Sequence, residues 1–204
     1  MQIVLATRNR HKKEELVALL QDLNVTIQTL DDFPDAPDVV EDGHTCEANA
    51  MKKAIEIARY TGLPAVADDT GLEVDALGGR PGVFAARYAG EHASYEDNCR
   101  KLLHELRAVP PAERGARFVT VAAIAFPTGK TMSVKGSLEG YIAEEATGIH
   151  GFGYDPVFVV PEYRQTLAQL SPELKNKISH RARAFKQAKE LLLQAMAEGH
   201  SVGA

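Results

Sequence analysis

The sequence predicts one α/β domain in which helices accompany short β-strands. In the first 75 residues, short apolar runs alternate with amphipathic segments, an order typical of βα units. Two β-rich runs, residues 116–126 and 131–143, are separated only by PTGK, which predicts a hairpin. An amphipathic segment over residues 171–196 predicts a long C-terminal helix. No repeat or linker composition divides the 204 residues, so we expect one domain over 1–204, with two lobes around a cleft.

Composition limits the classes of function. The chain is 45% hydrophobic and 25% charged, which is ordinary for a globular protein, and its formal net charge is −5. This charge argues against a surface built for nucleic acid or an acidic membrane. Cys46 and Cys99 show neither a disulfide framework nor a zinc spacing. The apolar run in MQIVLATRNR is too short for a signal peptide, so the cytoplasm is the expected compartment.

The first sixty residues predict two strands and two helices. QIVLAT reads as a buried strand, and NRHKKEELVALLQDL follows with leucines at helical spacing. NVTIQTL predicts a second strand, which leads into the acidic, proline-containing loop DDFPDAPDVVEDG. A helix from about Thr45 to Tyr60 comes next, and Gly62 and Pro64 end it. The expected buried stripe of this helix comprises Met51, Ala54, Ile55 and Ala58.

Two adjacent acids, Asp68 and Asp69, follow in the stretch AVADDTG. Neighbouring side chains of a strand point to opposite faces, so at most one acid would enter an apolar core, and only with a partner. Because Asp, Thr and Gly favour turns, we expect the pair at the carboxyl end of a strand, where open α/β sheets bind ligands. On this stretch alone, a solvated turn and a metal or catalytic site are equally supported.

The second half predicts further helices and strands. SYEDNCRKLLHELRAV reads as an amphipathic helix that ends before Pro110 and Pro111. The glycine-rich stretch GIHGFGYDPVF leads into a short strand after the hairpin. Ser171 as N-cap and Pro172 at the first helical position start the single long C-terminal helix. Residues 197–204 are expected to fray.

Four segments carry side chains suited to an anionic, metal-bound ligand. ATRNRHK joins a strand to a helix N-terminus rich in cations, although a solvated basic helix start is the favoured interpretation of this segment on its own. No phosphate-binding glycine motif is present. Glu41 could join the acid pair in holding Mg²⁺. Asn49 and Lys53 share a helix face and could line a site beside the acids, although a solvated pair is equally supported. GFGYDP offers aromatic faces for stacking, or is a buried aromatic turn before a strand. KNKISHRARAFK offers charge and hydrogen-bond donors, although a helix rich in Lys and Arg is more often only solvated.

Together these segments resemble the inosine/xanthosine triphosphate pyrophosphatase family, which removes non-canonical purine nucleotides (dITP, ITP and XTP). Thr7, Asn9 and Lys12 match its opening motif, ADDTG matches its acidic block, and LGGRPGVFAARYAG matches its proline-glycine loop. GFGYDP and the serine-histidine-arginine at 179–181 match the later motifs. The resemblance implies an α/β fold with an elongated, mixed β-sheet flanked by helices and the active-site cleft between two lobes. It also implies a homodimer, Mg²⁺ as cofactor, and hydrolysis to the monophosphate and pyrophosphate.

The resemblance also implies residue roles. Asp69 would be the general base and a metal contact, with Asp68 beside it, and Glu41 of the acidic loop remains the candidate for a third metal ligand. By the resemblance, the substrate-binding residues are Thr7, Asn9, Lys12, Lys53, Thr70, Phe152, Gly153, Tyr154, Asp155, Lys175, His180 and Arg181, and the cationic helix start adds Arg8, Arg10 and His11 as candidates.

The sequence departs from the family pattern at two positions. Arg8 stands where glycine is frequent, and Ala48 stands where a glutamate usually precedes the asparagine. Two other functions compete with the one implied: a pyrophosphatase for modified pyrimidine nucleotides, and a nucleotide-binding protein without turnover. The joint presence of Asp69, GFGYDP and the serine-histidine-arginine disfavours both.

Overall fold

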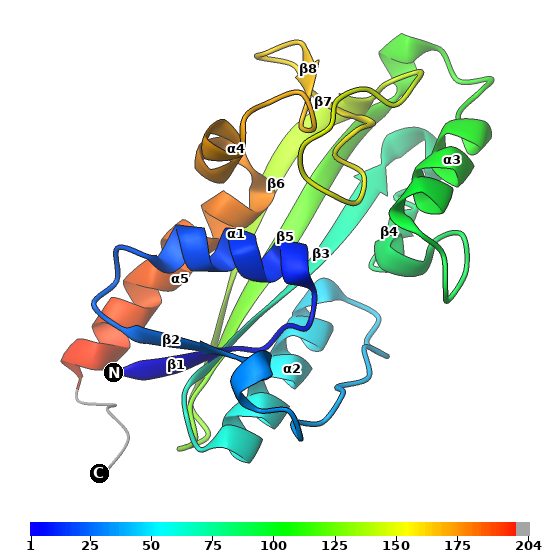
Figure 1. Ribbon diagram of the computed structural model, residues 1–204. Coiled ribbons are helices and arrows are strands. Elements are labelled where there is room, and N and C mark those ends of the chain that lie inside the picture. Colours follow the sequence, from blue (N-terminus) through cyan, green and yellow to red (C-terminus); the bar gives the residue numbers. More distant parts are fainter. Residues whose placement is uncertain (199–204) are drawn as a thin grey trace. The chain divides into compact units, whose positions relative to one another are not determined.

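The computed structural model describes residues 1–198 and separates them into two compact units (Figure 1). Unit 1 comprises Met1–Asp69, Thr120–Gly136 and the chain from Arg181 onward. Unit 2 comprises Thr70–Val119 and Ser137–His180. Each unit therefore assembles segments that are far apart in the sequence.

Helices and strands alternate through the first half of the chain, as the sequence predicts. The helices are α1 (Arg10–Leu20), α2 (Cys46–Thr61), α3 (Tyr95–Glu105), α4 (Pro172–Ile178) and α5 (His180–Ala197). The strands are β1 (Gln2–Leu5), β2 (Thr26–Thr29), β3 (Ala65–Val74), β4 (Pro81–Gly82), β5 (Gly115–Ala125), β6 (Thr131–Ile142), β7 (Phe158–Val160) and β8 (Gln165–Thr166).

The strands form a mixed sheet in the order β2-β1-β3-β5-β6-β7-β8, with β4 paired to β3. Strand β1 runs parallel to β2 and β3, whereas the pairs β3–β4, β6–β7 and β7–β8 are antiparallel. Residues 126–130 connect β5 to its neighbour β6 in a tight turn, in which Gly129 has a φ of 89°. The mixed α/β class and the hairpin predicted from the sequence are thereby confirmed.

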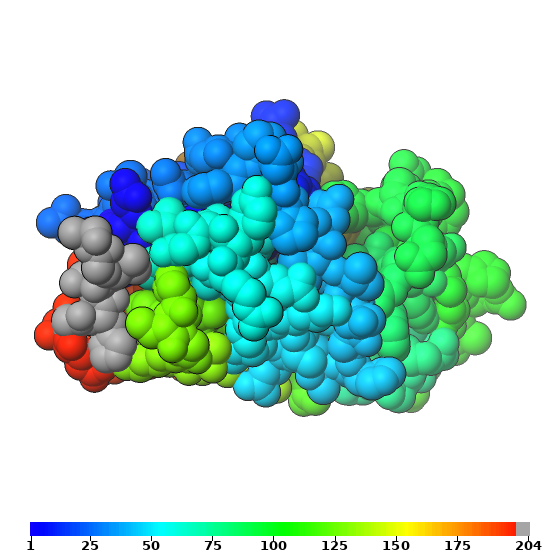
Figure 2. All heavy atoms as spheres, turned by 90° about the horizontal axis from the view of Figure 1, so that it is seen from below, coloured from blue at the N-terminus to red at the C-terminus, as the bar shows by residue number. Residues whose placement is uncertain are grey.

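In unit 1, strand alternation assigns side chains to two hydrophobic layers. Ile3, Leu5 and Val66 pack in one cluster with residues of α1 and α5. Val4 and Ala67, one residue away in the chain, pack in the other cluster with residues of α2. The sheet of unit 1 therefore lies between α1 and α5 on one face and α2 on the other, and Figure 2 shows the outer surface of α2 in light blue and cyan.

Unit 2 has its own core beneath the glycine-rich segment. Leu102 of α3, Phe118 of β5 and Phe158 of β7 contribute to it, and Tyr154 packs there as well. The Tyr154 hydroxyl donates to the Ala85 carbonyl at 2.8 Å, which satisfies its polar atom inside the core. The loop that carries GFGYDP is therefore anchored by an aromatic side chain.

The expected position of the two acids was wrong. Asp68 and Asp69 lie inside the ten-residue strand β3 instead of at its end, and both are buried, with 0% and 5% of their surface exposed. The expectation that at most one would enter the interior fails because cationic and amide side chains from several helices meet them there.

Three further details differ from the prediction. The segment after Ser171 forms two helices, because Ser179 has an extended backbone (ψ 159°) and its N–H closes α4 on the Lys175 carbonyl. The buried stripe of α2 includes Asn49, Ala50 and Lys53 beside Ala54 and Ala58, whereas Met51 and Ile55 are half-buried. Helix α3 ends at Glu105, whereas the segment predicted to be helical runs on to Val109. The predicted fraying falls largely on residues 199–204, which lie outside the described residues.

Candidate active site

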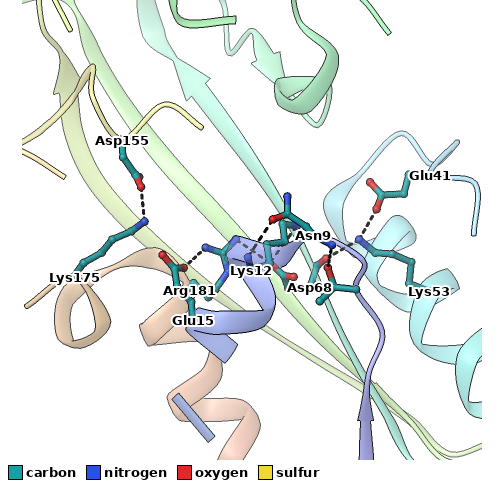
Figure 3. A network of polar contacts seen from close by, with 10 residues as sticks. Asn9, Lys12, Glu15, Glu41, Lys53, Asp68, Asp155, Lys175 and Arg181 are labelled. Atoms are coloured by element: carbon teal, nitrogen blue, oxygen red, sulfur yellow. Dashed lines mark hydrogen bonds and ion pairs between the residues drawn. The ribbon is translucent and has the colours of Figure 1, made fainter. Parts of the chain in front are cut away.

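Asp68 points to the face of β3 that α1 and α5 cover, where two cationic side chains hold it. Its Oδ2 accepts hydrogen bonds from Arg181 Nε at 3.1 Å and Nη2 at 3.0 Å, and Lys12 Nζ lies 3.3 Å away. Arg181 is 2% exposed, and its Nη1 donates to Glu15 Oε2 at 2.7 Å. Figure 3 shows this cluster, in which one guanidinium bridges a carboxylate of β3 and one of α1.

Asp69, one residue further, points to the opposite face, which α2 covers. Asn49 Nδ2 donates to its Oδ2 at 3.1 Å. Lys53, one helical turn after Asn49, donates to the Asp68 carbonyl oxygen at 2.7 Å and to Glu41 Oε1 at 2.5 Å. The buried face of α2 thus brings Glu41 of the acidic loop near the strand that carries both aspartates (Figure 3).

These surroundings shift the pKa values of the two aspartates in opposite directions. Burial alone would raise the pKa of Asp68, but Lys12, Arg181 and Lys53 together hold it well below its usual value. Burial also raises the pKa of Asp69; the opposing effects of Lys12, Lys53 and the Asn49 hydrogen bond do not cancel this rise, and Glu41 adds to it. Asp69 is therefore the more basic of two neighbouring carboxylates.

The pKa of Lys53 changes for related reasons. Burial of its ammonium group lowers the pKa, but the negative charges of Asp68, Glu41 and Asp69 outweigh that effect and the net pKa is raised. Lys53 therefore remains protonated at neutral pH inside the protein. A buried cation that keeps its charge can balance negative charge that is brought to the site.

The N-terminus of α1 adds backbone donors to the same unit. Asn9 caps the helix, its side-chain oxygen accepting from Lys12 N at 3.2 Å, and Thr7 Oγ1 accepts from Asn9 N at 3.2 Å. Arg8 and Arg10 do not join the carboxylate cluster. Arg8 donates to Asp38 and to the Ala36 carbonyl, and Arg10 pairs with Glu14 on the exposed surface of α1.

Unit 2 holds a second buried ion pair, between Asp155 and Lys175. Asp155 Oδ2 contacts Lys175 Nζ and accepts the Phe152 N–H at 2.8 Å. Lys175 Nζ also lies 4.9 Å from the centroid of the Phe152 ring. The centroids of the Phe152 and Tyr95 rings are 5.7 Å apart. Gly151 allows this approach, because a Cβ there would lie 2.0 Å from Asp155 Oδ2.

The predicted site residues consequently fall into two groups. Unit 1 brings together Lys12, Lys53, Asp68, Asp69 and Glu41 with Arg181. Unit 2 contains the predicted residues Thr70, Phe152, Gly153, Tyr154, Asp155, Lys175 and His180. His180 is buried and stacks on Phe118, with ring centroids 4.3 Å apart, and His11 lies exposed on α1.

In the cluster of unit 1, Glu15 was not predicted, and Asn49 was considered only with Lys53, as a polar pair that could line a site beside the acids. Glu15 pairs with Arg181, and its position three residues after Lys12 places both on one helix face, but such a spacing is common on solvated helices. Asn49 contacts Asp69, and the spacing of four residues from Lys53 was the available sequence signal. Neither spacing reveals which side chain lies opposite.

The acids of unit 1 have the right chemistry for Mg²⁺. Within residues 1–198, no three His, Cys, Asp or Glu side chains converge in a metal-binding group. Mg²⁺ commonly uses only one or two carboxylates, with waters and substrate phosphates as its other ligands. Glu41 and Asp69 interact electrostatically on the α2 side and fit this pattern, whereas Asp68 faces Arg181 and Lys12 on the other side.

Fold and site together define an α/β protein whose sheet buries adjacent carboxylates among cationic side chains. The chain belongs to the Ham1 family, which it matches over residues 3–191. It is 52% identical over 190 residues to a dITP/XTP pyrophosphatase of Geobacter sulfurreducens, covering 93% of this chain and 96% of the relative. It is 50% identical over 192 residues to a dITP/XTP pyrophosphatase of Desulforamulus reducens, covering 94% and 96%.

Solved structures of the same family share the fold. A HAM1 protein from Coxiella burnetii superposes with a TM-score of 0.86 at 42% identity, covering 96% of this chain and 100% of that one. The Ham1 protein of Staphylococcus aureus gives a TM-score of 0.81 at 41% identity, covering 98% and 100%. None of the helices in residues 1–198 is long and apolar enough to cross a membrane.

Proposed function

We propose that this chain hydrolyses dITP, XTP and ITP to the nucleoside monophosphate and pyrophosphate. The observation that carries the proposal is the pair of buried carboxylates on β3, of which Asp69 is the more basic and faces Glu41 and Lys53. Membership of the Ham1 family and the names of relatives about 50% identical support the same activity. The proposed role is to keep non-canonical purine nucleotides out of DNA and RNA, in the cytoplasm and as a homodimer.

In the proposed reaction, water attacks the α-phosphorus and pyrophosphate leaves. Asp69 orients the water and takes its proton, a role that its raised pKa favours because a more basic carboxylate is a better proton acceptor. Lys12 and Lys53 balance the negative charge that develops on the leaving group. No side chain needs to form a covalent intermediate.

The proposed cofactor is Mg²⁺, bound through Asp69 and Glu41, with Asp68 as the third predicted ligand. When bound, the ion polarises phosphate oxygens and offsets their charge. Glu41 already accepts a hydrogen bond from Lys53, so its carboxylate would bind either the Lys53 ammonium group or Mg²⁺. Asp68 contributes chiefly through its bonds to Arg181, which fix the strand segment that precedes Asp69.

The remaining predicted residues would bind the rest of the nucleotide. Thr7, Asn9 and the start of α1 offer hydroxyl, amide and N–H groups for phosphate and sugar. Phe152 would stack on the base, and Lys175 beside it would supply charge. His180 and Arg181 keep their predicted role as donors to the carbonyl at position 6 of hypoxanthine or xanthine, a group that adenine lacks.

A pyrophosphate-release assay with dITP, XTP, dUTP and ATP tests this proposal. We expect rapid release from dITP and XTP and slow release from dUTP and ATP. Preference for dUTP would support the pyrimidine alternative, and tight dITP binding without release would support a binding protein.

A further inference from the structure

The side-chain amide of Asn49 joins two segments that carry proposed active-site acids. Its Oδ1 accepts the backbone N–H of Gly43 at 2.8 Å, in the loop that also bears Glu41. Its Nδ2 donates to Asp69 Oδ2 at 3.1 Å. Asn49 is 1% exposed and lies near the start of α2, so water does not compete strongly for either bond.

The two partners fix which way the amide points. A backbone N–H can only donate and an ionised carboxylate can only accept, so the oxygen of Asn49 must face Gly43 and its NH₂ must face Asp69. The loop reaches Asn49 because residue 43 has no side chain. A Cβ at Gly43 would lie 2.6 Å from Asn49 Oδ1 and 2.9 Å from Ala48 Cβ.

We infer that Asn49 is a positioning residue for the hydrolysis: the loop at Gly43 holds its amide, and the amide holds the carboxylate of Asp69 in its reactive orientation. This inference rests on the proposed role of Asp69 as general base. The torsion that rotates an aspartate carboxylate is broad, so a directed hydrogen bond to Oδ2 restricts it. Small misplacement of a catalytic group costs a large share of the rate.

Helix α3 of unit 2 supplies a matched control. Asn98 is also 1% exposed, and its amide also makes two hydrogen bonds. Its Oδ1 accepts the Ala89 N–H at 2.7 Å, and its Nδ2 donates to the Ala86 carbonyl at 3.1 Å. The arrangement matches that of Asn49, except that a backbone carbonyl replaces the carboxylate.

The test compares Asn49→Asp, Asn49→Ala and Asn98→Asp. Asn49→Asp keeps an acceptor for Gly43 but turns the donor that faces Asp69 into an acceptor, whereas Asn49→Ala removes both bonds. We expect both Asn49 variants to lose at least about 30-fold in kcat for dITP, with KM changed by less than about threefold. Asn98→Asp should lower Tm about as much as Asn49→Asp but change kcat by less than about threefold.

Calorimetry with a dITP analogue that has a methylene bridge between the α- and β-phosphorus gives a readout apart from turnover. Its affinity for both Asn49 variants should stay within about threefold of the wild-type value. If Asn49→Asp keeps the wild-type kcat while Asn49→Ala does not, the hydrogen bond to Gly43 alone is sufficient for full activity. The inference that Asn49 positions Asp69 would then be wrong. An equal loss of kcat in Asn98→Asp would also refute it, because destabilisation alone would then explain the effect.

Folding of the variants does not decide the outcome by itself. If Asn49→Asp fails to fold, Asn49→Ala is judged alone, and a kcat within about threefold of wild type overturns the inference. If the wild-type protein releases no pyrophosphate from dITP or XTP, the proposed function fails first, and the positioning role fails with it. The two failures are therefore distinguished by the wild-type measurement.

Discussion

Both units bury ion pairs, but they build them differently. In unit 1, two adjacent residues of one strand send their carboxylates to opposite faces, where Arg181 and Lys12 meet Asp68 and Asn49 meets Asp69. In unit 2, one carboxylate, Asp155, closes a loop by contacting Lys175 and the Phe152 N–H. Unit 1 therefore places two carboxylates on opposite faces of one strand, whereas unit 2 pairs one carboxylate with one ammonium group.

This difference shows how a sheet can assign two chemical roles to neighbouring residues. Asp68 is held by cations and has a lowered pKa, so it remains a charged structural partner. Asp69 has a raised pKa and faces the helix that carries Lys53, so it is suited to accept a proton. Asp155 has no such neighbouring acid, and its contacts instead fix the Phe152 loop beside Lys175.

Removal of the metal should have the largest effect and should act only through unit 1. We expect chelation with EDTA to abolish pyrophosphate release, Mg²⁺ or Mn²⁺ to restore it, and Zn²⁺ to restore it poorly, because the predicted ligands are all oxygen atoms. Glu41→Gln should raise the Mg²⁺ concentration needed for half-maximal activity. Full activity after exhaustive chelation would remove the carboxylates of unit 1 from the mechanism.

Asp69→Asn should be the most damaging single substitution. We expect kcat to fall by ~10²–10⁴-fold, because a positioned general base contributes that much, while triphosphate binding stays measurable. Steady-state kinetics at saturating Mg²⁺ and calorimetry provide the two readouts. If kcat stayed within about threefold of wild type, Asp69 would not be the general base, and the proposed difference in role between Asp69 and Asp68 would be wrong.

Arg181→Ala tests whether Arg181 contacts the purine of the substrate in addition to its hydrogen bonds with Asp68 and Glu15. Removal of the guanidinium takes away three hydrogen bonds to Asp68 and Glu15, so we expect the free energy of unfolding to fall by about 3–5 kcal/mol. If Arg181 also contacts the purine, kcat/KM should fall more for ITP than for ATP. We therefore expect the ratio of kcat/KM for ITP to that for ATP to become smaller in Arg181→Ala. An equal loss of kcat/KM for ITP and ATP would mean that Arg181 only bridges the carboxylates of Asp68 and Glu15.

The pair in unit 2 should affect stability more than chemistry. We expect Asp155→Asn to lower the free energy of unfolding by about 3 kcal/mol, because it leaves the buried Lys175 ammonium without its carboxylate. Lys175→Met in the same chain should recover part of that loss, as urea unfolding of the two single variants and the double variant would show. Strictly additive losses would mean that the two side chains are not coupled.

Local patterns were sufficient to predict most of the fold. Apolar periodicity located the helices α1, α2 and α3, and the turn PTGK located the hairpin of β5 and β6. The break at Ser179 was missed because neither glycine nor proline marks it. The burial of both aspartates was missed because their partners are distant in the sequence: Arg181 is 113 residues from Asp68, and Asn49 is 20 residues from Asp69.

The candidate site could be predicted from motifs but not from spacing. Family resemblance named Asp69, Lys12 and Lys53, and these residues do lie in one cluster of unit 1. No local rule connects Gly43 with Asn49 or Glu15 with Arg181, because those contacts arise only when the elements pack. The catalytic and substrate roles themselves stay predictions until they are measured.

The most direct test of the account is the fate of the oxygen atom from water. Hydrolysis of dITP in H₂¹⁸O, followed by mass spectrometry, shows which phosphorus is attacked. If Asp69 activates water toward the α-phosphorus, the label appears in the monophosphate and pyrophosphate remains unlabelled. Label in pyrophosphate, or in inorganic phosphate, would contradict the proposed reaction.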